Sequence, residues 1–208
     1  MAAFFGNLKA VVIASFVLAL LLVGVYGATQ GFDGAAFELF TLRWLHIASG
    51  VMWIGLLWYF NFVQIPTMPK IPAELKPAVG GYIAPAALFW FRWAAMATIV
   101  LGIMLAGRNH YLLEAYTLDL SEGAAGWPNV PKYLAIGIGM WLGAIMWFNV
   151  WFVIWPNQQK ALNISGKYPS LSAEEKAAAA KTAMIFSRTN TLLSLPMLFS
   201  MVAAGHLY

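Results

Sequence analysis

The chain has 208 residues, of which 62% are hydrophobic and 10% are charged, whereas soluble domains carry about 25% charged residues. This composition excludes soluble enzymes, nucleic-acid-binding proteins and disordered tails, and it indicates a small integral membrane protein. The absence of cysteine excludes disulfides, iron–sulfur clusters and haem that is attached covalently through a Cys-x-x-Cys-His motif.

Five apolar stretches are long enough to span a bilayer, which takes about 20 residues of α-helix. They cover residues 9–28, 42–65, 85–107, 133–155 and 181–206. The first is longer than the core of a signal peptide, so we expect it to be retained. The predicted fold class is therefore all-α, an integral membrane protein with five transmembrane helices.

We expect a single membrane domain over residues 1–208. Its predicted parts are an N-terminal helix with an outer loop (1–41), a first hairpin (42–110), an outer loop (111–132) and a second hairpin (133–208). Four prolines predict a stiff, non-helical connection inside the first hairpin. They are Pro66, Pro69, Pro72 and Pro77. In the second hairpin, Ser172 and Glu175 have the spacing of a capping box, which predicts the start of a helix.

The distribution of basic residues predicts the orientation of the helices, because cytoplasmic loops are enriched in Lys and Arg. With the N-terminus inside, the inner segments hold seven basic residues, namely Lys9, Lys70, Lys76, Lys160, Lys167, Lys176 and Lys181. The outer segments hold three, namely Arg43, Arg108 and Lys132. We therefore expect the N-terminus inside and the C-terminus outside, in a bacterial inner membrane.

An internal repeat relates the second and fourth predicted helices. Four residues of the second helix recur in the fourth at a constant offset of 88: Trp53, Gly55, Phe60 and Asn61 correspond to Trp141, Gly143, Phe148 and Asn149. A weaker match at an offset of 96 relates Arg92 and His110 to Arg188 and His206. The repeat predicts two hairpins of the same direction that form a four-helix bundle core, with the N-terminal helix outside it.

The three histidines of the chain, His46, His110 and His206, all fall at the predicted outer face. Gly50 and Trp53 follow His46 at i+4 and i+7 on one helix face, where a glycine admits a flat macrocycle and an aromatic ring stacks on it. Membrane bundles with opposed histidines hold b-type haem without covalent bonds. We therefore predict haem b, with His46 and His206 as ligands of the iron and His110 as the alternative ligand.

Two other interpretations of the histidines stay open. Each histidine could be an interfacial residue that is hydrogen-bonded to loops or to lipid headgroups. All three could also form a copper or zinc site, since histidine-rich sites suit those metals, but haem is the favoured cofactor.

Two arginines and two asparagines lie in the inner half of the predicted spans, namely Arg92, Arg188, Asn61 and Asn149. An arginine inside a membrane helix normally faces a cavity or a partner, and the five spans contain no Asp or Glu that could pair with it. These four residues therefore predict an anion or substrate site. Alternatively, both arginines extend along the helix surface to lipid phosphates.

Three stretches of sequence have a recognisable pattern. They are Trp44-Leu-His46 through Trp53-Ile-Gly55 to Gln64-Ile-Pro66, then Trp147-Phe-Asn149 to Pro156-Asn157-Gln158, then Ser187-Arg188-Thr-Asn190 to Pro196-Met197 with Gly205-His206. Together they resemble the membrane domain of cytochrome-c-linked urate oxidases, over most of the chain. The pattern His46…Trp53-x-Gly55 is more distantly similar to haem-binding membrane bundles of the protoporphyrinogen oxidase and copper-resistance types.

The resemblance implies a membrane redox protein, with urate oxidase-type oxidoreductase activity as one expectation. Full-length urate oxidases of this type carry a cytochrome c domain after the membrane part, and this chain stops at Tyr208 without a cysteine. The expected electron acceptor is therefore a separate cytochrome c or similar protein on the outer side. The alternatives are a non-catalytic accessory subunit of a larger respiratory or photosynthetic membrane complex and a protoporphyrinogen-oxidising membrane enzyme.

Overall fold

The computed structural model describes residues 2–31, 33–119 and 131–208, and within these ranges it contains helices and turns but no strand. The predicted all-α class is confirmed. The chain divides into two compact units, Met1–Thr41 and Leu42–Tyr208. This boundary coincides with the predicted start of the first hairpin. The predicted outer loop 111–132 falls largely on residues 120–130, which lie outside the described ranges.

The first unit contains α1 (Ala2–Phe5), α2 (Leu8–Gln30) and the beginning of α3 (Gly34–Trp58). The Asn7 side chain accepts a hydrogen bond from the backbone N–H of Ala10 and so caps α2. The carboxylate of Asp33 accepts one from the N–H of Ala35 at the start of α3. Large apolar side chains are exposed along the length of α2, which is expected of a helix whose solvent is lipid.

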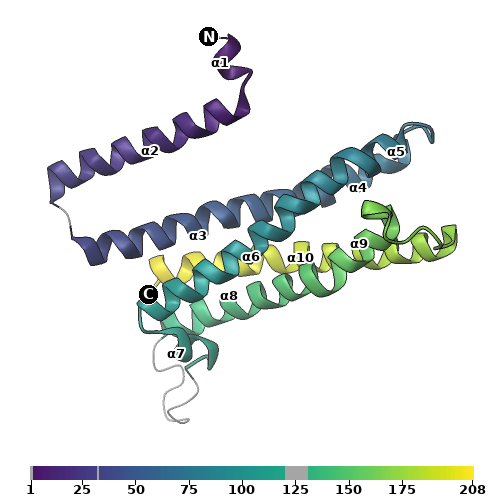
Figure 1. The fold of residues 1–208 in the computed structure, drawn as a ribbon. Helices are drawn as coiled ribbons and strands as arrows, with labels where there is room; N and C mark the ends of the chain where they lie inside the picture. Colours follow the sequence, from purple (N-terminus) through teal and green to yellow (C-terminus); the bar gives the residue numbers. More distant parts are fainter. Residues whose placement is uncertain (1, 32, 120–130) are drawn as a thin grey trace. The chain divides into compact units, whose positions relative to one another are not determined.

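The second unit contains four long helical rods, two from each predicted hairpin (Figure 1). In the first hairpin, α3 continues through η1 (Tyr59–Gln64), α4 (Ile65–Thr67) and η2 (Met68–Lys70), and the return rod consists of α5 (Lys76–Ala78), η3 (Val79–Ile83) and α6 (Ala84–Arg108). The second hairpin consists of α8 (Pro131–Phe148), η4 (Asn149–Ile154), α9 (Trp155–Leu162), η5 (Ile164–Gly166) and α10 (Ala173–His206). The short α7 (Leu112–Tyr116) follows α6.

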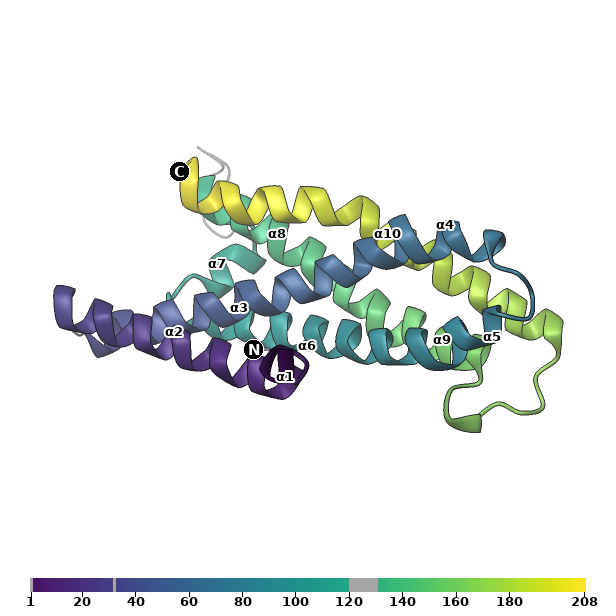
Figure 2. The same cartoon turned by 90° about the horizontal axis from the view of Figure 1, so that it is seen from above.

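Four helical stretches are long and apolar enough to cross a membrane, namely Leu8–Thr29, Gly34–Lys70, Lys76–Arg108 and Pro131–Leu162. The fifth predicted span lies in α10, which has 34 residues and carries more polar side chains. Together these helices indicate a membrane protein in contact with a lipid bilayer. In both views α6 ends, α8 begins and α10 ends at one end of the second unit, which we call the C-terminal end (Figures 1 and 2).

The prolines of the first hairpin interrupt the helices less than predicted. The helical rods extend as far as Lys70 and resume at Lys76. Pro77 stands in the first turn of the return rod, where a missing N–H leaves no intrahelical hydrogen bond unmade. Pro66 lies inside the first rod, directly after the π-helical η1, and Pro69 lies in η2. The prediction of a wholly non-helical connection was therefore wrong at these three positions.

The two helices that are related by the internal repeat share a local irregularity. Each changes from α- to π-helical pairing, over Tyr59–Gln64 in one and over Asn149–Ile154 in the other. The repeated asparagines, Asn61 and Asn149, both lie in these π-helical segments and are buried. π-Helical segments are rare and are frequently found at functional sites.

The core of the second unit lies between its long helices. Its most deeply buried side chains include Trp53, Leu57, Phe91 and Met146, each at most 2% exposed. The two tryptophans of the repeat lie in different environments. Trp53 is buried, whereas Trp141 is 46% exposed and donates its indole N–H to the carbonyl of Tyr116.

Gly137 allows α7 to pack against α8. A Cβ atom at this position would collide with the carbonyl oxygen of Ala115. The stacked rings of Tyr111 and Tyr133 lie beside this contact, with centroids 6.0 Å apart. Burial raises the pKa of Tyr111, and that of Tyr116 as well. The polypeptide after α6 is therefore folded onto the second hairpin.

The capping box at the start of α10 is confirmed. The N–H of Glu175 donates to the Ser172 hydroxyl at 3.1 Å, and the N–H of Ser172 donates to the Glu175 carboxylate at 2.8 Å. We expect Ser172→Ala to lower the free energy of unfolding by about 1 kcal/mol, because one N–H at the start of the helix loses its acceptor. SDS-driven unfolding measures this loss. Ser170→Ala, in the exposed loop before the helix, is the control, and an equal effect of both changes would contradict the role of the cap.

Candidate functional site

His46 lies in the middle of α3 and is bonded to α6. Its Nδ1 is 2.9 Å from the carbonyl oxygen of Thr98. Since a carbonyl only accepts hydrogen bonds, Nδ1 is the nitrogen that donates. In the neutral imidazole the proton then lies on Nδ1, and Nε2 keeps its lone pair. The ring is thus fixed in the tautomer that leaves Nε2 for a ligand.

Gly102 makes room for the His46 ring. A Cβ at Gly102 would lie 2.9 Å from Cε1 and 3.2 Å from Nδ1 of His46. Gly50, which the sequence analysis placed beside a macrocycle, lies at ordinary contact distance from Thr98, with 3.8 Å from its ideal Cβ to the Thr98 methyl group. The close approach in this region is therefore made by the glycine on α6.

Replacing Gly102 by alanine tests this packing. We expect Gly102→Ala to displace the His46 ring and to lower the free energy of unfolding by about 1–3 kcal/mol, the usual range for overpacking. The measurement is SDS-driven unfolding of the purified protein. Gly107→Ala on the same helix is the matched control, because no atom lies within 4 Å of its added Cβ. Equal free energies of unfolding for the two variants would show that Gly102 does not pack closely against the His46 ring.

Trp53 is only 1% exposed, and its indole N–H has no hydrogen-bond partner among the described residues. The indole N–H groups of Trp147 and Trp151 are buried without a partner as well. All three rings belong to, or pack against, the core of the second unit. Two side-chain carbonyl oxygens, of Asn61 and Gln64, are also buried without a hydrogen-bond donor among the described residues.

The other two histidines are exposed and lie towards the C-terminal end of the unit. His110 has a left-handed backbone (φ 58°) just after α6, and His206 is the last residue of α10. At about 1.5 Å per helical residue, His110 lies about 12 Å beyond the level of Gly102. Within the described ranges, no group of three His, Cys, Asp or Glu side chains could hold a metal ion. The structure thus brings His46 to Thr98 and Gly102, and it shows no contact among the three histidines.

The two predicted asparagines of the anion site are bonded to α10. The Asn61 amide donates to the hydroxyl of Ser187 at 2.8 Å and to the carbonyl of Leu57 at 2.9 Å. Asn149 donates to the side-chain oxygen of Asn190 at 2.8 Å, and Asn190 donates to the carbonyl of Met146 at 2.9 Å. These bonds join α10 to both π-helical segments.

The two predicted arginines are in different surroundings. Arg188 is exposed on α10. Arg92 is half-buried on α6, and its guanidinium carbon lies 3.7 Å from the centroid of the Trp155 ring. No hydrogen bond in the described part of the chain joins any two of the four residues predicted to bind an anion.

A polar stripe on α10 was not predicted from the sequence. Ser187, Asn190 and Ser194 are buried, and Ser194 accepts a hydrogen bond from the Trp58 indole at 3.0 Å. Their spacing of i, i+3 and i+7 places them on one helix face. That spacing in an apolar helix is a signal that could have predicted an interhelical polar contact.

Comparison with known proteins gives a family signal for the second hairpin. Residues 130–207 match the family described as urate oxidase N-terminal. The matched stretch contains Asn149, Arg188 and His206, whereas His46 and Arg92 lie outside it. No curated protein and no solved structure matches the chain. The chain is therefore similar to urate oxidases over its second hairpin.

Proposed function

We propose that the chain is a membrane-integral redox protein that binds b-type haem, is related to urate oxidases, and passes electrons to a separate cytochrome c or similar acceptor. The family match over residues 130–207 supports the relation to urate oxidases. The geometry of His46 carries the haem proposal, because this imidazole lies inside a membrane helix and its Nδ1 hydrogen bond leaves Nε2 for a metal.

The surroundings of His46 fit a histidine that would hold haem iron. Metal-ligating histidines almost always donate their second N–H to a carbonyl or carboxylate, which fixes the ring and raises its basicity. The Thr98 carbonyl provides this partner, and Gly102 provides the space for the ring. Haem, when bound, supplies one-electron redox chemistry. The part of Thr98 and Gly102 is to hold the imidazole in one orientation.

His206 is the proposed second ligand and His110 the alternative. Because Thr98 and Gly102 hold the His46 ring in place, the second histidine would have to reach the metal from the C-terminal end of the unit. The exposed position of His206 at the end of α10 leaves its side chain free of the packed core.

Reduced-minus-oxidised spectra of the purified protein test the proposal. We expect a b-type α-band after reduction with dithionite, and haem that acid–acetone extracts because no cysteine holds it covalently. His206→Ala and His110→Ala then identify the second ligand. The substitution that removes the ligand should convert a six-coordinate haem spectrum to a five-coordinate one. A protein that stays colourless when it is produced with excess haem would contradict the proposal.

A further inference from the structure

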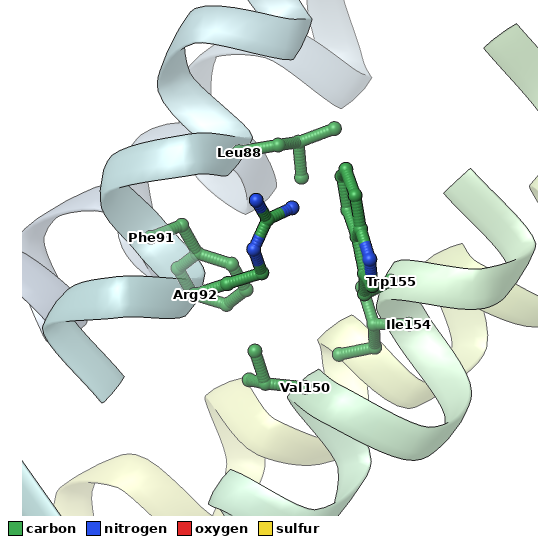
Figure 3. Close-up of a pocket in the computed structure, with 6 residues that line it drawn as sticks. All are labelled: Leu88, Phe91, Arg92, Val150, Ile154 and Trp155. Atoms are coloured by element: carbon green, nitrogen blue, oxygen red, sulfur yellow. The ribbon is translucent and has the colours of Figure 1, made fainter. Parts of the chain in front are cut away.

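The arginine of α6 lies in a narrow crevice against the second π-helical segment (Figure 3). The crevice is open on one side and encloses no water-sized cavity, and the roughly 150 Å³ of space within it includes the space outside the protein surface. Apart from Arg92 its lining is apolar or aromatic, and consists of Leu88, Phe91, Val150, Ile154 and Trp155. A single cation is thus held among side chains that do not neutralise it.

One edge of the Arg92 guanidinium lacks an acceptor. Its Nη1 is buried and makes no hydrogen bond to any described residue. The indole N–H of Trp151 is also buried without a partner, and the centroid of that ring lies 5.8 Å from the guanidinium carbon. The helices on either side of the crevice contain no Asp or Glu, over residues 84–108 in one and 131–162 in the other. A buried donor without an acceptor destabilises the folded protein. A ligand with oxygen acceptors and a negative charge would remove this cost.

The packing of Arg92 determines how such a ligand can approach. Trp155 covers the guanidinium with its ring face, at 3.7 Å from the centroid. A stacked guanidinium keeps its in-plane N–H groups for other partners. These groups form a planar fork that matches two oxygens of a phosphate or carboxylate. An oxyanion can therefore approach Arg92 edge-on only from the open side of the crevice.

The surroundings of the crevice identify the source of the oxyanion. The neighbouring side chains of Phe89, Trp90 and Trp93 are 47%, 58% and 46% exposed, as expected of a surface that faces lipid tails. The exposed Lys160 follows Trp155 by five residues, or about 7.5 Å of helix. Lys70 and Lys76 lie at the same end of the unit as α9. Basic pockets between membrane helices are typical binding sites for acidic headgroups.

We propose that Arg92, supported by Trp155 and Trp151, binds the phosphate group of an acidic membrane lipid. The apolar lining of the crevice contacts the part of the lipid next to the headgroup. The site is separate from His46, since Thr98 follows Arg92 on α6 by six residues, or about 9 Å of helix. It therefore does not depend on haem binding.

Native mass spectrometry of the full chain, with phosphatidylglycerol and phosphatidylcholine added in turn, tests this site. We expect the wild-type protein to retain phosphatidylglycerol at least about fivefold more than phosphatidylcholine, as expected for one well-placed basic residue. Arg92→Gln should remove this preference. Arg92→Lys should keep only part of it, because lysine lacks the planar fork. Arg43→Gln is the matched control, since that arginine is exposed on α3, and it should retain the full preference.

Three outcomes would overturn the proposal. The first is equal retention of both lipids by the wild-type protein, which decides the matter even if Arg92→Gln fails to fold. The second is an unchanged preference in Arg92→Gln, or an equal loss in Arg43→Gln. The third is displacement of the lipid by millimolar inorganic phosphate or urate, which would show that the crevice takes a soluble anion instead.

Discussion

Asn190→Leu is expected to lower the free energy of unfolding by about 2–4 kcal/mol. The side chain is fully buried, and it both accepts a hydrogen bond from Asn149 and donates one to the carbonyl of Met146. Leucine fills the volume but leaves both partner groups without a hydrogen bond, and each such buried group costs about 1–3 kcal/mol. SDS-driven unfolding measures the change.

Two further variants separate the interhelical network from a general effect of the substitution. Thr189→Val is the matched control, because that hydroxyl bonds only within its own helix, to the carbonyl of Ile185. It should change the free energy of unfolding by less than about 1 kcal/mol. Asn149→Leu combined with Asn190→Leu should cost less than the sum of the single changes, since neither partner is then left unpaired. Strict additivity would show that the two amides do not stabilise each other.

The positions of the membrane helices were predictable because their hydrophobic length dominates the sequence. A stretch of about 20 apolar residues has few alternatives to a helix in lipid, since every backbone N–H and C=O must be bonded within the segment. Residues 133–155, for example, lie inside Pro131–Leu162. The ends were less predictable, because a proline directly after a π-helical segment does not end the helical rod, as Pro66 shows.

The π-helical segments were not predictable from hydrophobic patterns. An α-helix and a π-helix bury the same kinds of residue, and they differ in a backbone pairing that one extra residue changes. The repeat of Phe60-Asn61 as Phe148-Asn149 indicated that the two helices have something in common. What they share became apparent in the contacts, where a carbonyl shortly before each π-helical segment accepts a hydrogen bond from a carboxamide. Leu57 accepts it from Asn61 of the same helix, and Met146 accepts it from Asn190 of α10.

The candidate site was predictable in its residue types but not in its partners. His46 was singled out because an imidazole in an apolar helix is uncommon, and Arg92 because a charge there is costly. Their partners are the Thr98 carbonyl and the Trp155 ring, which lie 52 and 63 positions away along the chain. Backbone carbonyls and tryptophans are abundant in any membrane protein, so nothing local in the sequence distinguishes these two.

His46→Ala is expected to remove haem from the purified protein, with a loss of affinity on the order of 100-fold or more. Changes to groups that only orient a metal ligand already cost about 10–100-fold, and this change removes the ligand itself. The reduced α-band should disappear from protein purified without added haem. Gly102→Ala should weaken binding less, because it displaces the imidazole without removing it. The measurement is haem titration followed by absorbance.

Restoration by added imidazole distinguishes a lost ligand from a misfolded protein. The substitution leaves a space beside Gly102 that free imidazole can enter, so imidazole should restore the spectrum of His46→Ala and leave that of Gly102→Ala unchanged. Ser49→Ala is the matched control on the same helix, because its hydroxyl bonds only to the carbonyls of Leu45 and His46 in the preceding turn. It should bind haem as the wild-type protein does. A wild-type spectrum in His46→Ala would show that the Thr98–His46 bond only joins α3 to α6, and the haem ligand would then have to come from elsewhere in the chain.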